Sequence, residues 1–259
     1  MTKVTDRYDD KNLINLAKQQ YDKKQKSKLP SDIVKLPSAG KIYPEDSLLR
    51  QGSVEMRHMT AYDEDILTNR SYINEGVVLD KLLDSLITSD IDINELAVFD
   101  KEALIVNARI SAYGSKYPIV VIDPKTKNKI DRSIDLNDLK FKSVDLDTNE
   151  DGECIYHCED GSIIHYSYAP KKQNIEITES NRISSFLLTL IREINKKRNV
   201  EDIKKYIQYD FTFQESKKFQ KYVLDNMPGL VTEIEVEGDD GGTFTAGFQF
   251  GPDLFWPNL

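Results

Sequence analysis

The chain has 259 residues, of which 39% are hydrophobic and 31% are charged, and its formal net charge at pH 7 is −9. This composition is typical of a soluble globular protein with one large domain or two smaller ones. No apolar run approaches the ~20 residues that cross a bilayer, so a membrane-spanning protein is excluded. The acidic balance also argues against a nucleic-acid partner, because an acidic surface repels phosphate groups and releases few counterions.

The positive charge is concentrated at the start of the chain. Residues 1–28 carry eight Lys or Arg and four Asp, which gives this segment +4 and leaves −13 for the remaining residues. The apolar stripe Leu13–Ala17 predicts a short helix, and the lysine-rich run after it stops at Pro30. We therefore expect residues 1–35 to form a basic, partly disordered arm. The arm lacks the apolar centre of a secretory signal, and two cysteines suit a reducing compartment, so we expect a cytoplasmic protein.

The folded body is predicted to begin with a turn-rich segment followed by helices. Two prolines and a glycine within residues 35–44 indicate an extended segment with turns. Thr60 and Asp63 have the spacing of a capping box. Asp100 is expected to cap a later helix that Gly114 ends. The helices are predicted over 60–69, 76–88 and 100–114.

Alternating apolar and polar residues then predict two β-hairpins. The first joins strands over 117–122 and 130–136, and the second spans 153–168. Asp160 and Gly161 form a dipeptide typical of a type I′ turn, so we place the second turn there.

A last predicted region, 176–259, combines helices with a hairpin and an aromatic tail, and follows a first folded region over 36–175. Its helices and strands are expected over 180–197, 201–208, 213–226, 232–237 and 243–250. The order of helix, short link and hairpin occurs over 101–136 and again over 213–250, which suggests a weak internal duplication. The predicted fold class is α+β, with helical layers flanking short antiparallel β-hairpins.

One group of residues has the chemistry of a zinc site. Cys154, Cys158 and His165 carry suitable ligand atoms on the second predicted hairpin. Alternation along a strand places both cysteines on one face and His157 on the other, and we expect His165 to lie opposite Tyr156. A fourth ligand is not evident, so we favour an ordinary hairpin with no metal and no cofactor. A metal-binding regulatory or interaction module using Cys154, Cys158 and His165 is the alternative.

Catalytic motifs are not found in the sequence. It has three histidines and lacks a nucleophile elbow, a phosphate-binding glycine loop and a metalloprotease helix. Its many carboxylates fall in first turns of helices and at hairpin tips, where capping and solvation explain them. We therefore predict that the protein is not an enzyme and has no catalytic residues.

The C-terminal segment carries the only tryptophan, Trp256, between Phe255 and Pro257. Large apolar side chains near a chain end require packing, either on the core of the same chain or on another subunit. Both alternatives remain open from the residues alone.

Four separated segments together resemble the baseplate hub proteins and hub assembly factors of T-even-type contractile-tailed bacteriophages. They are residues 36–44 (LPSAGKIYP), 55–65 (EMRHMTAYDED), 108–114 (ARISAYG) and 255–257 (FWP). The resemblance implies a non-enzymatic protein that joins the hub or helps it to assemble. It implies that the partners are other phage baseplate or tail proteins. It also implies that the chain is in the host cytoplasm during assembly, and in the tail baseplate of the finished virion if it is a structural subunit. Self-association and association with another protein fit the residues equally well.

The resemblance also suggests roles for the matching residues. Backbone turns are expected at Gly40 and Gly114, partial core packing at Tyr43 and Tyr113, and surface or interdomain ion pairs at Arg57 and Arg109. The interface residues it suggests are Phe255, Trp256 and Pro257. Some relatives carry cysteine pairs on their hairpins, but the turns 123–129 and 238–242 contain no cysteine here, so no metal is carried over.

Overall fold

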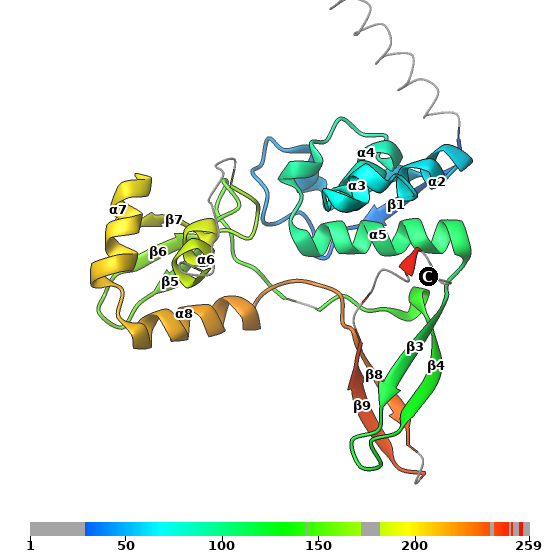
Figure 1. Ribbon diagram of the computed structural model, residues 1–259. Helices are drawn as coiled ribbons and strands as arrows, with labels where there is room; N and C mark the ends of the chain where they lie inside the picture. Colours follow the sequence, from blue (N-terminus) through cyan, green and yellow to red (C-terminus); the bar gives the residue numbers. More distant parts are fainter. Residues whose placement is uncertain are drawn as a thin grey trace, which may run out of the picture.

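The computed structural model describes residues 29–142, 144–171, 182–238, 241–248, 250 and 254–255. It shows a mixed α+β chain whose sheets are small and antiparallel, which confirms the predicted fold class. Figure 1 shows two lobes joined by a long connection, with two β-hairpins projecting beneath one of them. Buried apolar residues form one cluster that continues through all of these parts. The helix expected over Leu13–Ala17 lies outside the described residues.

The first lobe packs helices against a two-stranded sheet. An isolated bridge between Met56, in this sheet, and Ile87 ties the end of the helix Val78–Leu86 to the sheet. The elements of this lobe are β1 (Ser31–Lys35), η1 (Leu48–Gln51), β2 (Ser53–Arg57), α2 (Ala61–Leu67), α3 (Arg70–Asn74), α4 (Val78–Leu86), η2 (Ile93–Glu95) and α5 (Val98–Tyr113). The capping box predicted at Thr60 and Asp63 is present at the start of α2, which confirms that helix.

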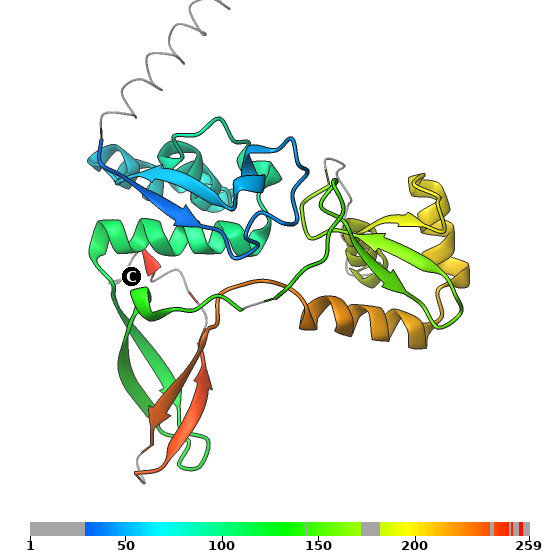
Figure 2. The same cartoon turned by 180° about the vertical axis from the view of Figure 1, so that it is seen from behind.

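Two hairpins lie side by side below α5 (Figures 1 and 2). Their elements are β3 (Lys116–Ile122), β4 (Lys129–Asp135), η3 (Leu136–Asp138), β8 (Glu233–Glu237) and β9 (Thr243–Gly247). Residues of β3 alternate between exposed and buried, so one face of the first hairpin is apolar and covered. In the hairpin formed by β8 and β9, Val236 and Ala246 are buried. The hairpins predicted over 117–136 and 232–250 are therefore confirmed.

The second lobe is a three-stranded sheet with helices around it. Its elements are β5 (Cys154–His157), β6 (Ile163–Tyr166), α6 (Arg182–Leu190), β7 (Ile191–Ile194), α7 (Val200–Lys205), the π-helical turn η5 (Tyr206–Asp210) and α8 (Phe213–Asp225). The strand order is β5-β6-β7. Tyr166 on β6 contacts the ring of Phe219 on α8 edge to face at 5.5 Å. An aromatic core thus fixes α8 on the sheet.

A two-stranded ribbon connects the second lobe to the hairpins. The backbone N–H of Lys142 donates to the carbonyl of Gly229 at 2.8 Å, and that of Val231 donates to Lys140 at 2.8 Å. The chain therefore leaves the first hairpin along one side of the ribbon and returns to the second hairpin along the other, as Figure 2 shows. The second lobe is inserted between the two hairpins.

The predicted helix over 180–197 is only half right. The helix α6 ends at Leu190, and Ile191–Ile194 form β7, which pairs with β6. Ile191 and Ile194 are buried in the strand, and apolar residues three positions apart would also fit the buried face of a helix, so their spacing does not distinguish the two. The open edge of β6 decides the outcome, because its backbone groups need partners.

Two further local predictions are wrong. Asp100 does not cap α5, whose first residue is Val98 after the N-cap Ala97. The turn at Gly161 is not of type I′, because Gly161 has φ +86° while Asp160 is not among the residues with positive φ. A backbone hydrogen bond from Cys158 to Ser162 closes a longer loop instead.

None of the helices in the described part of the chain is long and apolar enough to cross a membrane.

Candidate interaction site between the lobes

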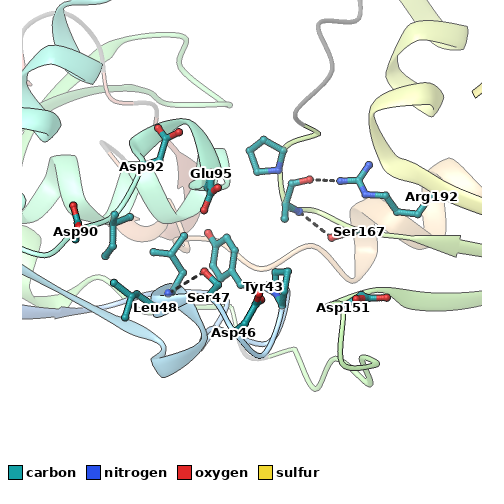
Figure 3. A pocket seen from close by; sticks show the side chains of 15 residues that line it. Tyr43, Asp46, Ser47, Leu48, Asp90, Asp92, Glu95, Asp151, Ser167 and Arg192 are labelled. Carbon is teal, nitrogen blue, oxygen red and sulfur yellow. Dashed lines mark hydrogen bonds between the residues drawn. The ribbon is translucent and has the colours of Figure 1, made fainter. Parts of the chain in front are cut away.

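A cavity of about 500 Å³ lies where the two lobes meet (Figure 3). The first lobe supplies the turn Tyr43–Leu49 and the loop Asp90–Glu95, and the second lobe supplies Asp151, Ser167–Pro170 and Arg192. Because segments far apart in sequence line it, the cavity exists only when the lobes are docked. Its size falls within the range of binding pockets.

The turn on the first-lobe side is built around Gly40. Its φ is +78°, and a Cβ at this position would lie 2.4 Å from the carbonyl oxygen of Arg50. Only glycine fits such a position without moving backbone. The guanidinium of Arg50 donates to the carbonyl oxygens of Lys41 and Tyr43, which holds the turn from the other side.

A buried polar network attaches this turn to α5. The Tyr43 hydroxyl donates to Asp100 Oδ2 at 2.6 Å and accepts from the backbone N–H of Ala97 at 3.0 Å. Ser38 donates to the same carboxylate through its hydroxyl and its backbone N–H. Burial raises the pKa of Asp100 above its ordinary value, although the hydrogen bonds from Tyr43 and Ser38 act in the opposite direction. Asp100 therefore holds Tyr43, which lines the cavity, and does not act as the cap of a helix.

The lobes dock through close backbone contact. The N–H of Glu45 donates to the carbonyl of Glu150 at 3.0 Å, and the hydroxyl of Thr148 donates to the carbonyl of Lys41 at 2.9 Å. The rings of Phe99 in α5 and Tyr168 after β6 also meet at 6.1 Å. These contacts place the loop before β5 directly against the turn of the first lobe.

Arg192 is the cation on the second-lobe side of the cavity. It donates to the carbonyl of Thr189 at 2.7 Å and to that of Ala169, while Lys171 donates to the carbonyls of Leu188 and Ile191. The bonds to Leu188, Thr189 and Ile191 satisfy carbonyls where α6 gives way to β7. Burial lowers the pKa of Lys171 to about 8, with a further contribution from nearby Arg192, and burial lowers the pKa of Arg192 to about 10.

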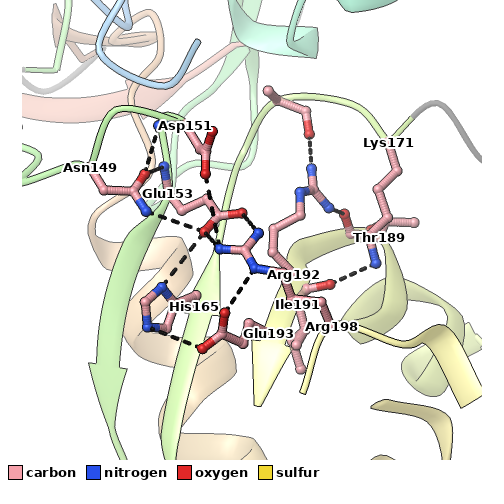
Figure 4. Close-up of polar contacts among 11 residues, drawn as sticks. Asn149, Asp151, Glu153, His165, Lys171, Thr189, Ile191, Arg192, Glu193 and Arg198 are labelled. Atoms are coloured by element: carbon pink, nitrogen blue, oxygen red, sulfur yellow. Dashed lines mark hydrogen bonds and ion pairs between the residues drawn. The ribbon is translucent and has the colours of Figure 1, made fainter. Parts of the chain in front are cut away.

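A network of charged residues fixes β7 beside the cavity (Figure 4). Arg198 binds Glu153 through two parallel contacts at 2.8 and 2.9 Å and Glu193 through its Nε at 2.8 Å. Burial opposes ionisation of Glu153, but hydrogen bonds from Arg198 and Asn149 outweigh it and hold the pKa of this carboxyl below its ordinary value. His165 lies between the carboxylates, 3.6 Å from Glu153 and 3.8 Å from Glu193.

The cavity is acidic. Its only cation among the described lining residues is Arg192. The carboxylates that line it are Asp46, Asp90, Asp92, Glu95 and Asp151. Asp46, Asp90, Asp92 and Asp151 are exposed at the surface, so the rim presents negative charge to the solvent. Such a surface attracts a basic partner.

The structure does not bring the three proposed zinc ligands together. Ile155, not Tyr156, lies opposite His165, so His165 and Ile155 share one face of the sheet. Cys154 points to the other face, where it is 4% exposed, and Cys158 is 6% exposed. Among the described residues, no group of three His, Cys, Asp or Glu side chains is arranged to hold a metal ion. The pairing of β5 with β6 differs by one residue from the predicted register, and this difference places His165 on the opposite face from Cys154.

Both cysteines are free thiols, and their burial predicts slow alkylation. Burial raises the pKa of Cys158 to about 11 from an ordinary value of 9.0 and raises that of Cys154 as well. At pH 8 the thiolate fraction of Cys158 should therefore be roughly 100-fold lower than in the unfolded chain. Iodoacetamide labelling followed by mass spectrometry should show slow modification in buffer and fast modification in urea. Equal rates in the two conditions would contradict this burial.

The C-terminal segment reaches back to α5. Phe255 is 3% exposed, and its ring meets that of Tyr113 edge to face at 6.4 Å. Tyr113 itself is 45% exposed. Trp256 and Pro257 lie outside the described residues. Phe255 thus packs on its own chain, which leaves the rest of the tail as the candidate contact.

Replacing Phe255 with leucine should lower the free energy of unfolding by about 1 kcal/mol, because the smaller side chain loses the contact with Tyr113 but remains apolar. Urea unfolding followed by circular dichroism measures this change. Unchanged stability would mean that Phe255 contributes nothing to the core.

The predicted turn glycines differ in their surroundings. Gly40 is enclosed by backbone, whereas Gly114 has φ +81° and nothing within 4 Å of an added Cβ. The ion pair expected at Arg57 is present, but it is buried within one lobe instead of lying at the surface or between domains, and the contacts of Arg109 are not ion pairs. Arg57 is buried and binds Asp63 within the first lobe, and Arg109 donates to the carbonyl of Gly114 and lies over the ring of Tyr113.

The acidic lining of the cavity was not anticipated. Its residues come from the loop after α4, the turn before η1 and the loop before β5, which are far apart in sequence. The one local signal is the pair Asp90 and Asp92 between two helices, which also fits ordinary capping, since Asp92 caps η2. The helix predicted over 180–197 contains Arg192, and this prediction does not place its side chain at a cavity.

One of the comparisons with known proteins identifies a family. The family model described as T4 bacteriophage base plate protein matches residues 29–243, which is well over half of the chain. Curated proteins and solved structures gave no match. The matched range covers both lobes and reaches the start of β9, so it includes every segment that lines the cavity. The chain therefore belongs to the family of T4-type bacteriophage base plate proteins.

Proposed function

We propose that this chain works in the central hub of a contractile phage tail, as a structural subunit or as a factor that assembles the hub, through protein–protein contacts and without catalysis. Membership of the baseplate family supports a place among tail proteins. The resemblance of residues 36–44, 55–65, 108–114 and 255–257 to hub proteins and hub assembly factors supports a place in the hub. Assembly takes place in the host cytoplasm under this proposal, and the chain remains in the virion only if it is a structural subunit.

The acidic cavity between the lobes is the observation that carries the proposal. Five carboxylates and one arginine among its described lining residues suit a basic protein segment. Both lobes contribute to the cavity, so a partner seated there would also hold the lobes together. The described lining contains no His, Cys or Lys beside the hydroxyls of Ser47 and Ser167, which favours binding over nucleophilic chemistry.

A second contact is proposed at the end of the chain. Phe255 secures the tail on α5, and Trp256 and Pro257 follow directly. Aromatic anchors of this kind are common at the centres of interfaces. We propose that Trp256 and Pro257 contact a hub partner.

Charge reversal at the cavity tests the proposal. In cells infected with the phage, a tagged chain carrying Asp46→Lys and Asp90→Lys should recover about tenfold less of its baseplate partner than the unchanged chain. The matched control carries Glu64→Lys and Asp65→Lys on α2, where both side chains are exposed and neither lines the cavity. Recovery of the same baseplate proteins by both variants would contradict a role for the cavity.

A further inference from the structure

A groove of about 570 Å³ separates β4 from β8, below the first lobe. Consecutive residues on both sides line it, including Arg132–Asp135 and Glu233–Glu237. Each strand has one partner within its own hairpin, so both strands present an outer edge to this groove. Figures 1 and 2 show the two hairpins next to each other.

The unpaired backbone groups of β4 point into the groove. Backbone hydrogen bonds from Leu136 to Ser115 and from Asp123 to Asn128 identify the residues of this hairpin that exchange bonds. Because bonded and non-bonded pairs alternate in an antiparallel ladder, the N–H and C=O groups of Ser133 and Asp135 face away from β3.

The unpaired backbone groups of β8 also lie on the side away from its partner strand. The N–H of Phe248 donates to the carbonyl of Thr232, and that of Gly238 donates to the carbonyl of Gly242. The backbone groups of Glu233, Glu235 and Glu237 therefore face away from β9. A contact at 2.8 Å from Arg132 Nη2 to the carbonyl of Glu237 confirms this direction.

The edges of β4 and β8 are linked by hydrogen bonds at both ends of the groove, and in the described part of the chain the outward-facing backbone groups between these links are unpaired. At one end Arg132 reaches Glu237, and at the other end the N–H of Val231 donates to the carbonyl of Lys140. Between these points, the backbone of Glu233 and Glu235 takes no partner among the described residues. The groove thus exposes strand edges that can accept another strand.

The charge of the groove indicates which kind of strand can bind there. Glu233, Glu235 and Glu237 lie on one exposed face of β8, and the residues opposite them on β9 are Gly247, Thr245 and Thr243. The hairpin β8–β9 therefore supplies no cation to these glutamates. Across the groove the described lining holds two cations, Arg132 and Lys140, beside Asp135 and Asp138, so the lining keeps an excess of negative charge. The inner side of the groove is apolar, with Ile234 half-buried and Val236 buried. A matching strand alternates basic residues facing outward with apolar residues facing inward.

We propose that an extended strand of a partner protein, with Lys or Arg at alternate positions, binds in this groove and adds to the edge of β8. This inference rests on the proposed function, because it requires a protein partner. The backbone of Glu233 and Glu235 provides the hydrogen bonds, and the glutamate side chains select basic residues.

Synthetic peptides test the groove directly. An acetylated peptide in which Lys alternates with Val should bind the full chain in a fluorescence anisotropy assay, and one in which Glu alternates with Val should not. Equal binding of the two peptides, or binding of neither, would overturn the proposal.

Substitution of Glu235 separates backbone pairing from charge. Proline removes the N–H of this residue, which points away from β9, so Glu235→Pro should leave the hairpin intact. The control Glu235→Thr removes the charge and keeps the N–H. Loss of one backbone bond should make the proline variant bind the Lys-Val peptide about tenfold more weakly than the threonine variant. Equal affinities, with the urea unfolding of both variants unchanged, would contradict strand addition.

A peptide of residues 1–28, which carries +4, tests whether the chain's own arm occupies the groove. If this peptide displaces the Lys-Val peptide and binds the proline variant more weakly than the threonine variant, the occupant is the arm and the partner strand is wrong. These binding results concern the groove alone. Absence of the chain from tails and tail intermediates would instead contradict the proposed function.

Discussion

Replacing Asp63 with alanine should lower the free energy of unfolding by about 3–5 kcal/mol, because it leaves the buried guanidinium of Arg57 without its partner. The two side chains form parallel contacts at 2.7 and 2.8 Å and are 5% and 0% exposed. Asp63 also accepts hydrogen bonds from Thr60 and Ser85, so the substitution removes the cap of α2 as well. Urea unfolding at pH 7 measures the loss.

The matched control replaces both partners with apolar residues. Arg57→Met with Asp63→Leu leaves no unpaired charge, so the double variant should be more stable than Asp63→Ala alone. A double variant that is no more stable than Asp63→Ala would show that the unpaired arginine is not the cause of the loss.

The same carboxylate predicts an acid-dependent loss of stability. Burial opposes ionisation of Asp63, but hydrogen bonds from Arg57, Thr60 and Ser85 outweigh it and hold its pKa below the ordinary value. A pKa that is lower in the folded chain than in the unfolded chain contributes stability above the unfolded value, and this contribution disappears as the pH falls through the folded value. The contribution should therefore be complete at pH 7 and decline below about pH 4.

Replacing Gly152 with alanine should lower the free energy of unfolding by about 3 kcal/mol and loosen the docking of the lobes. An added Cβ would lie 2.3 Å from the carbonyl oxygen of Ile42 in the other lobe, and the φ of Gly152 is +73°. Both the left-handed backbone and the clash with backbone are unfavourable, and neither neighbour is a flexible side chain. Hydrogen exchange should show faster exchange at the N–H of Glu45, which crosses between the lobes.

Gly161 provides the control for backbone conformation alone. Its φ is +86°, but nothing lies within 4 Å of an added Cβ. Gly161→Ala should therefore cost about 1 kcal/mol, which is the strain of the left-handed conformation without a clash. If Gly152→Ala costs no more than Gly161→Ala, the lobes do not pack as closely as the structure shows.

Local sequence signals predicted the elements whose cause is local. The capping spacing of Thr60 and Asp63 identified α2, and alternation with a polar turn identified both strands of the first hairpin. These signals act over a few residues, so they are readable without the rest of the fold.

The features that sequence reasoning missed depend on distant partners. Ile191–Ile194 become a strand because β6 offers an edge, and Asp100 enters the first turn of α5 because Tyr43 and Ser38 reach it across more than 50 positions of sequence. The cavity depends on the docking of Gly152 against Ile42. No periodicity within one segment reports such contacts, which is why the acidic lining was not anticipated.

Quantitative mass spectrometry of purified phage particles, and of tail intermediates isolated from infected cells, tests whether the chain works in the tail baseplate. We expect the chain to be found with other baseplate proteins. A fixed, low copy number in finished particles would identify a structural subunit, and presence in the intermediates alone would identify an assembly factor. Absence from both samples, with other baseplate proteins detected, would contradict the proposed function.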